Sequence, residues 1–161
     1  MSELKKVFEA VHENLNRLEK IITDKVENKG NGRFIDNGDN TVTDTKTGLQ
    51  WIKQHSKLGG DFAKQKMTFD DAIKACKNLD YAEHKDWRLP TREELCSIVD
   101  LLKSSPAIDQ IFTNTQSDWY WTSTPCAWVA GVAWCVGFNS GGVFDGIKGS
   151  GNYVRPVRAS Q

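Results

Sequence analysis

The chain has 161 residues, of which 39% are apolar and 26% charged, a balance typical of one folded domain with an appendage rather than of a disordered protein. Lys and Arg together number 21, as do Asp and Glu, so no basic excess predicts a nucleic-acid partner or an anionic membrane surface. The sequence has no run of about 20 apolar residues that would predict membrane insertion.

The first 20 residues are too charged to resemble a secretory signal. We therefore expect a virion-associated protein, or a cytoplasmic one that is exported by another route. The composition does not decide between these two compartments.

Residues 2–28 are predicted to form one helix with a coiled-coil seam. Its apolar residues recur at alternating gaps of four and three, in the order Leu4, Phe8, Val11, Leu15, Leu18 and Ile22. Because three heptads are marginal as an isolated helix in water, we expect a homo-oligomer through residues 4–22. A single helix docked on its own domain is the alternative. The strand number cannot be read from this seam.

The segment from Asn28 to Gly32 is predicted to break the helix and to act as a hinge. It divides the chain into residues 1–29, the amphipathic helix, and residues 30–161, the folded domain.

Short strands joined by turns are predicted next, at 33–35, 41–44 and 49–52. Asp36, Asp39 and Asp44 raise the question of a calcium site. Gly38 stands where an EF-hand has its third ligand, and turn chemistry explains the aspartates better. We expect no metal and no cofactor.

Two amphipathic helices follow a polar loop at 55–61. The first spans residues 68–79, is capped by Thr68 and should bury Phe69, Ala72, Ile73, Cys76 and Leu79. The second begins after Thr91 in a capping box and should bury Leu95, Ile98, Val99 and Leu102. Between them, Arg88 is expected to be at least half-buried and to need a carboxylate or carbonyl partner.

The last stretch, Trp119 to Arg158, differs from the rest in composition. Four of the six tryptophans lie in its first half, and only Asp145 and Lys148 are charged between Pro125 and Asn152. Strands are predicted at 119–123, 133–138, 143–144 and 153–158. Alternation directs Trp134, Val136 and Phe138 to the core, and Cys135 and Gly137 away from it. We expect this stretch to contact a ligand.

The four cysteines are Cys76, Cys96, Cys126 and Cys135, and none forms a C-x-x-C pair. We interpret them as reduced thiols that pack as small apolar residues. A disulfide between Cys76 and Cys96 is the alternative. His12, His55 and His84 lie in polar sequence contexts, and no catalytic residue is predicted.

Five segments in order resemble the C-type-lectin-like domain of bacterial and viral surface proteins, which also ends a collagen-like bacterial adhesin. They are residues 40–44, 47–51, 87–91, 120–124 and 154–158, which read NTVTD, TGLQW, WRLPT, YWTST and VRPVR. The resemblance covers about residues 33–158. It implies an α+β fold with a mixed, mainly antiparallel sheet and two helices, here preceded by a coiled-coil-like helix.

In a subset of that family, diversity-generating retroelements rewrite the C-terminal segment. The resemblance therefore implies a non-enzymatic, receptor- or adhesin-like protein that binds a protein or glycan on another cell or particle. Its hypervariable surface would lie at about residues 125–152. The implied ligand-binding positions are Cys126, Val129, Ala130, Val132, Cys135, Gly137, Asn139, Ser140, Gly142, Phe144, Asp145, Gly146, Ile147, Gly149, Ser150, Gly151 and Asn152.

A fixed frame would support those positions, as an antibody framework supports its binding loops. The implied frame residues are Trp121, Trp128, Trp134, Val136, Phe138, Val143, Tyr153 and Val154.

Three alternatives remain open. One is a lectin-like adhesin of fixed sequence, and another is a calcium-dependent sugar-binding lectin, although the sugar-selecting triplets of that class are absent. The third is an oxidase of the formylglycine-generating type, which would need Cys126 and Cys135 as a reactive, partly exposed pair.

Overall fold

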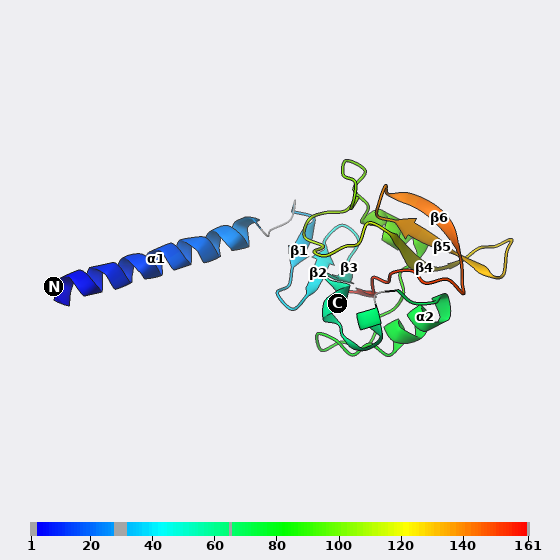
Figure 1. The fold of residues 1–161 in the computed structure, drawn as a ribbon, viewed down its shortest axis with the longest axis horizontal. Coiled ribbons are helices and arrows are strands. Elements are labelled where there is room, and N and C mark those ends of the chain that lie inside the picture. The colour runs from blue at the N-terminus through cyan, green and yellow to red at the C-terminus, as the bar shows by residue number, and fades with distance from the viewer. Residues whose placement is uncertain (1–2, 28–31, 65, 161) are drawn as a thin grey trace.

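The computed structural model describes residues 3–27, 32–64 and 66–160. Helix α1 (Glu3–Glu27) confirms the predicted N-terminal helix, and Figure 1 shows it extending away from the rest of the chain. All side chains from Lys5 to Lys20 are exposed, so this part of α1 is not docked on its own domain. The predicted hinge lies mostly outside the described residues, as do the side chains of Leu4 and Ile22.

The domain has an α+β architecture with two antiparallel sheets (Figure 1). The first sheet has the strand order β1-β2-β3-β7, with bounds Phe34–Asp36, Thr41–Asp44, Leu49–Ile52 and Val157–Ala159. The second has the order β4-β5-β6, with bounds Trp119–Pro125, Val132–Gly137 and Gly142–Ile147. The helices are α2 (Phe69–Lys77) and α3 (Arg92–Ser97), with 3-10 turns at His55–Lys57 and Gly60–Lys64. In the described parts of the chain, no helix has the length and apolar character needed to cross a membrane.

Local capping determines where both domain helices begin, as predicted. Thr68 accepts a hydrogen bond from the backbone N of Asp71, at 3.3 Å, at the start of α2. Thr91 and Glu94 form a complete capping box at the start of α3. The buried face of α2 includes Phe69, Ala72 and Cys76, but Ile73 is exposed, contrary to prediction.

Helix α3 is shorter than predicted, because the chain leaves it to pair elsewhere. The helix ends at Ser97, and Val99 then forms an antiparallel bridge with Ile108. Asp100 donates its backbone N–H to the carbonyl of Ala107, at 3.0 Å. Leu102 is 97% exposed, so its predicted burial is wrong.

The second sheet lies between two apolar clusters, one on each of its faces. Trp121, Ala133 and Cys135 belong to one cluster. The neighbouring Tyr120 and Val136 belong to the other cluster, which also contains residues of α3 and of the first sheet. Because both faces are covered here, the expectation that Cys135 and Gly137 point away from the core is wrong, and both are buried.

A buried guanidinium joins the last segment to the first sheet. Arg155 donates to the carbonyls of Ile52 and Lys53, at 2.6 and 2.8 Å, and to the hydroxyl of Thr115, at 2.6 Å. His55 is also buried, which corrects its assignment to a polar context. Burial and the neighbouring charge of Arg155 lower the pKa of His55 to about 4.

The predictions for Arg88 and for the cysteines differ in their outcome. Arg88 is exposed rather than half-buried, but it has the expected carboxylate partner, Glu94, at 2.6 and 2.7 Å. All four cysteines are free, so the reduced-thiol interpretation is confirmed and a disulfide between Cys76 and Cys96 is not formed.

Candidate binding face

The candidate site is built on the β5–β6 half of the second sheet. In the register of this pair, Val136 lies opposite Val143, Trp134 opposite Asp145 and Val132 opposite Ile147. Side chains at paired positions share one face of a sheet. Val136 is buried against the cluster that contains Leu95 of α3. The two pairs farther along the strands lie outside this cluster, and their side chains are half-buried or exposed.

We call this surface the outer patch, which consists of Trp128, Val132, Trp134, Val143, Asp145 and Ile147. Trp128 comes from the loop between β4 and β5, which projects from the domain in Figure 1. Its exposed fraction is 74%, and those of Ile147 and Val143 are 67% and 41%. An exposed apolar group of this kind, with a charged residue inside it, is typical of interaction surfaces.

Arg92 and Trp128 hold the ring of Trp134. The guanidinium carbon of Arg92 lies 5.2 Å from the centroid of the Trp134 ring. The ring of Trp128 meets the Trp134 ring edge to face, with the centroids 5.6 Å apart. The backbone N–H of Arg92 donates to the hydroxyl of Thr124, at 3.0 Å, which ties the start of α3 to the end of β4. The outer patch and the adjoining Arg92 therefore present Trp and Arg, the residue types that dominate binding energy at interfaces.

These residues were not among the predicted binding positions. Trp128, Trp134 and Val143 were expected in the frame, and Arg92 had no predicted role. Trp128 and Val143 are exposed, so their assignment to a buried frame is wrong, and Trp134 is half-buried. The other frame residues, Trp121, Val136, Phe138, Tyr153 and Val154, are buried as predicted.

The opposite face of β6 is closely packed through glycines. The ring of Phe144 stacks on Trp119, with centroids 5.1 Å apart and planes 6° apart. A Cβ added to Gly142 would lie 2.8 Å from the Phe144 ring. A Cβ added to Gly146 would lie 2.9 Å from the sulfur of Cys135 and 3.0 Å from the Trp121 ring. The backbone there lies too near the rings for larger side chains.

The implied ligand-binding positions accordingly divide by burial. The exposed positions are Val129, Ala130, Asn139, Ser140, Asp145, Ile147, Gly149, Ser150 and Gly151. Those of intermediate burial are Val132, Gly142 and Phe144. The buried positions are Cys126, Cys135, Gly137, Gly146 and Asn152, which expose almost no surface to a ligand.

The two cysteines in this region do not form a reactive pair. Both are buried, and no disulfide joins them. Burial raises the pKa of Cys135 to about 12, and the amide of Asn152 donates to its sulfur at 3.3 Å. A nucleophilic cysteine needs the opposite environment, one that is electropositive and partly exposed.

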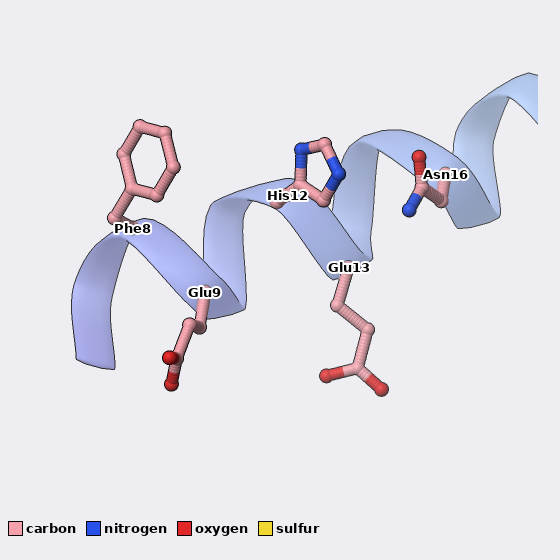
Figure 2. Close-up of a pocket in the computed structure, with 5 residues that line it drawn as sticks. All are labelled: Phe8, Glu9, His12, Glu13 and Asn16. Carbon is pink, nitrogen blue, oxygen red and sulfur yellow. The ribbon is translucent and has the colours of Figure 1, made fainter. Parts of the chain in front are cut away.

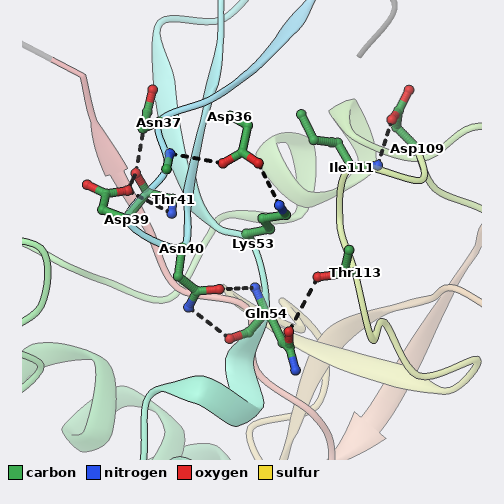
Figure 3. A network of polar contacts seen from close by, with 11 residues as sticks. Asp36, Asn37, Asp39, Asn40, Thr41, Lys53, Gln54, Asp109, Ile111 and Thr113 are labelled. Carbon is green, nitrogen blue, oxygen red and sulfur yellow. Dashed lines mark hydrogen bonds and ion pairs between the residues drawn. The ribbon is translucent and has the colours of Figure 1, made fainter. Parts of the chain in front are cut away.

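The aspartates of the first turn have partners within the turn itself, which confirms the turn interpretation (Figure 3). Asp36 accepts from the backbone N of Gly38, at 3.0 Å, and pairs with Lys53, at 2.6 Å. Asp39 accepts from the backbone N of Thr41, at 2.9 Å. Among the described residues, no group of at least three His, Cys, Asp or Glu side chains is placed to hold a metal ion.

Several concave surfaces of the described residues lie outside the outer patch. Gly151 borders a pocket of about 430 Å³ with Lys66, Thr68 and residues of α2. Another is a groove of about 330 Å³ on α1, lined by Phe8, Glu9, His12, Glu13 and Asn16 (Figure 2). All lining residues of this groove come from one helix, so it is a surface of α1 and not an enclosed site.

The family model of the Lcl C-terminal domain matches residues 40–158 of the chain. No curated protein matches the chain. The matched range contains β2 to β6, the first two residues of β7, α2 and α3, and therefore the whole outer patch, whereas α1 and β1 precede it.

Proposed function

Since the chain belongs to the Lcl C-terminal domain family, we propose that it is a non-enzymatic, receptor- or adhesin-like protein whose outer patch binds a protein or glycan on another cell or particle. The carrying observation is that Trp128 is 74% exposed and contacts a second tryptophan held by Arg92. The Trp134 ring on β5, the Trp128 ring packed against it from the neighbouring loop and the Arg92 guanidinium give a ligand apolar area at small entropic cost. The two antiparallel sheets and two helices support the C-type-lectin-like fold as part of this proposal.

Diversification by a retroelement belongs to the proposal only at the exposed positions of residues 125–152. Val129, Ala130, Asp145 and Ile147 can change there without disturbing the core. The test is in the adjacent DNA. A near-copy of this coding segment that differs only at adenines, beside a reverse transcriptase gene, supports diversification, and its absence contradicts it.

A lectin-like adhesin of fixed sequence is the second candidate, and the packed glycines favour it. Gly142 and Gly146 lie so close to aromatic rings that most substitutions would force the sheet to shift. Both candidates bind through the outer patch. They differ in whether the sequence of the patch is rewritten by a retroelement or is fixed.

The absence of an enzymatic activity is also proposed, and the thiols support it. The pKa of Cys76 and that of Cys135 are both raised to about 12 by burial, so these sulfurs are protonated at neutral pH. A purified chain incubated with copper and a cysteine-containing peptide should leave the peptide unoxidised, and oxidation would restore the oxidase alternative.

The self-association of α1 completes the proposal. The seam side chains Phe8, Val11, Leu15 and Leu18 are each more than half exposed. Apolar residues with this heptad spacing become buried when helices associate with further copies. Several outer patches would then act together on one target.

Binding by the outer patch can be tested by probing arrays of glycans and cell-surface proteins with the full chain. Trp128→Ala should reduce each signal by about tenfold or more, because hot-spot truncations cost at least 1–2 kcal/mol. Leu102→Ala is the matched control, since Leu102 is an even more exposed apolar residue and lies outside the patch. Equal loss in both variants, or no loss in either, would contradict the proposal.

A further inference from the structure

Strand β6 is the open edge of the second sheet. The sheet order is β4-β5-β6, and within the part of the chain that the structure describes β6 pairs only with β5 along its length. The other edge, β4, is covered by the chain itself, because Trp121 donates its backbone N–H to Tyr153 and Tyr153 donates to Trp119, both at 2.9 Å. An exposed edge strand offers a row of backbone donors and acceptors to another strand.

The alternation of backbone hydrogen bonds in the sheet shows which backbone groups of β6 face away from β5. Lys148 donates its backbone N–H to Gly131 at 2.9 Å, and Phe138 donates to Asp118 at 3.0 Å. Residues of an antiparallel strand alternate between bonding one neighbour and the other. In that alternation Phe144 and Gly146 bond to β5, whereas the backbone groups of Val143 and Asp145 and the N–H of Ile147 point to the open side. The carbonyl of Ile147 accepts from the backbone N of Ser150, at 2.8 Å, so the open row ends there.

These same three residues carry the outward side chains of the outer patch. Val143 and Ile147 are exposed apolar residues that flank Asp145, which is also exposed. An added strand would therefore meet apolar side chains at two positions and a carboxylate between them. Cross-strand neighbours of opposite charge stabilise a sheet, and like charges directly opposite destabilise it.

Asp145 argues against a second copy of this chain as the added strand. Antiparallel pairing of two β6 strands that uses all three outward positions places Val143 opposite Ile147 and Asp145 opposite Asp145. Two carboxylates would then meet at the centre of the new pair. A charged side chain in the middle of an edge strand is a usual protection against edge-to-edge pairing of identical chains.

We propose that β6 binds an extended peptide segment of a partner protein by strand addition, with a Lys or Arg opposite Asp145 and apolar residues opposite Val143 and Ile147. This inference rests on the proposed function and identifies the ligand class as a protein segment. Backbone hydrogen bonds supply affinity in this mode, and the alternate side chains supply specificity. Trp128 and Trp134 border the same face of the sheet and extend the contact beyond β6.

The experiment selects binders to the full chain from a library of random ten-residue peptides displayed on phage. Enriched peptides should share a Lys or Arg between alternating apolar residues. When the library is selected on the Asp145→Lys variant, the enriched peptides should have Asp or Glu in place of the Lys or Arg. In nuclear magnetic resonance spectra, the amides of Val143 and Asp145 should become protected from hydrogen exchange when a selected peptide binds.

Val143→Pro provides the direct test of the backbone contact. Proline removes an outward N–H that is not used within the sheet, a position that edge strands tolerate. The variant should melt within a few degrees of the parent and lose about tenfold or more in peptide affinity. Val143→Thr keeps the N–H and should bind within about twofold, as befits a β-branched replacement.

The outcomes separate this inference from the proposed function. Peptides that bind Val143→Pro as well as the parent, an unchanged charge preference with Asp145→Lys, or the absence of any enriched peptide would each overturn strand addition. If such peptides or array ligands still lose binding with Trp128→Ala, the outer patch remains the binding surface without strand addition. If Val143→Pro loses binding and Trp128→Ala does not, the edge alone is the site.

Discussion

His55 packs against the rings of Tyr120 and Tyr153, with centroids 6.3 and 5.6 Å away, and is only 3% exposed. Burial lowers its pKa to about 4, below the value of about 6.5 of an unfolded chain. Between these values the unfolded state binds the extra proton, so the free energy of unfolding should decrease as the pH falls from about 6.5 to 4. The expected loss is about 3 kcal/mol at the acid end. Urea unfolding at several pH values measures it.

The variant His55→Phe keeps a ring between the two tyrosines and removes the titrating group. Its free energy of unfolding should stay nearly constant between about pH 6.5 and 5.5. As the pH falls further, toward the ordinary carboxyl pKa values of about 4, both proteins should lose additional stability, because hydrogen bonds and charge interactions with Arg33 and Arg88 lower the pKa values of Asp44 and Glu94, partly offset by burial. Parallel slopes for the two proteins above pH 4 would show that His55 is not responsible.

Gly146 and Gly149 form a matched pair for the packing of the site. A Cβ at Gly146 would meet Cys135 at 2.9 Å, whereas a Cβ at Gly149 would have no atom within 4 Å. Gly146→Ala should therefore lower the free energy of unfolding by about 1–3 kcal/mol through overpacking. Gly149→Ala should change it by less than about 0.5 kcal/mol. Thermal unfolding measures the stability of both variants. If Gly146→Ala were as stable as Gly149→Ala, position 146 could accept diversification.

Single-residue environments could be predicted from the sequence where they depend on near neighbours. The capping box of Thr91 and Glu94 spans one helical turn, and its pattern is visible in the sequence. The burial of His55 depends instead on Tyr120 and Tyr153, which lie far along the chain, while its adjacent residues are polar. Trp128 illustrates the converse, since the family resemblance implied a frame residue and the side chain is 74% exposed on its loop.

At the scale of elements, period-two alternation predicted the two faces of β5 but not what covers them. Val136 and Cys135 point to opposite faces, and each reaches an apolar cluster. Alternation alone identifies a buried face only when the other face is solvated. Leu95 of α3 belongs to the cluster that covers Val136, whereas at Trp134 the helix contributes only the Arg92 guanidinium, so the outer patch stays open there. The end of α3 at Ser97 is followed by the distant contact between Val99 and Ile108, which no local pattern predicts.

The seam of α1 gives the prediction that belongs to an element. Leu15→Glu places a carboxylate in the seam, whereas Asn16→Glu adds the same charge at the neighbouring exposed residue outside it. The parent and Asn16→Glu should sediment as oligomers at micromolar concentration. Leu15→Glu should sediment as a monomer with the melting temperature of the domain unchanged. A monomeric parent, or equal oligomers in all three proteins, would contradict association through the seam.

At the scale of the whole molecule, α1 and the outer patch lie in different parts of the chain and have separable tasks. The described side chains of α1 from Lys5 to Lys20 are exposed, and the patch is built only from the domain. A substitution in the seam should therefore leave single-site binding intact. Association of several domains would convert that modest affinity into avidity on a surface that carries many ligands.

The last prediction compares the parent with Leu15→Glu on two formats of the same selected peptide. In solution, where one peptide meets one domain, both proteins should bind with equal affinity. On a surface densely coated with the peptide, the parent should dissociate about 100-fold or more slowly, because each rebinding step is intramolecular. Trp128→Ala should weaken binding in both formats. If Leu15→Glu weakened binding in solution as well, α1 would contribute directly to the site, and the separation of helix and patch would be wrong.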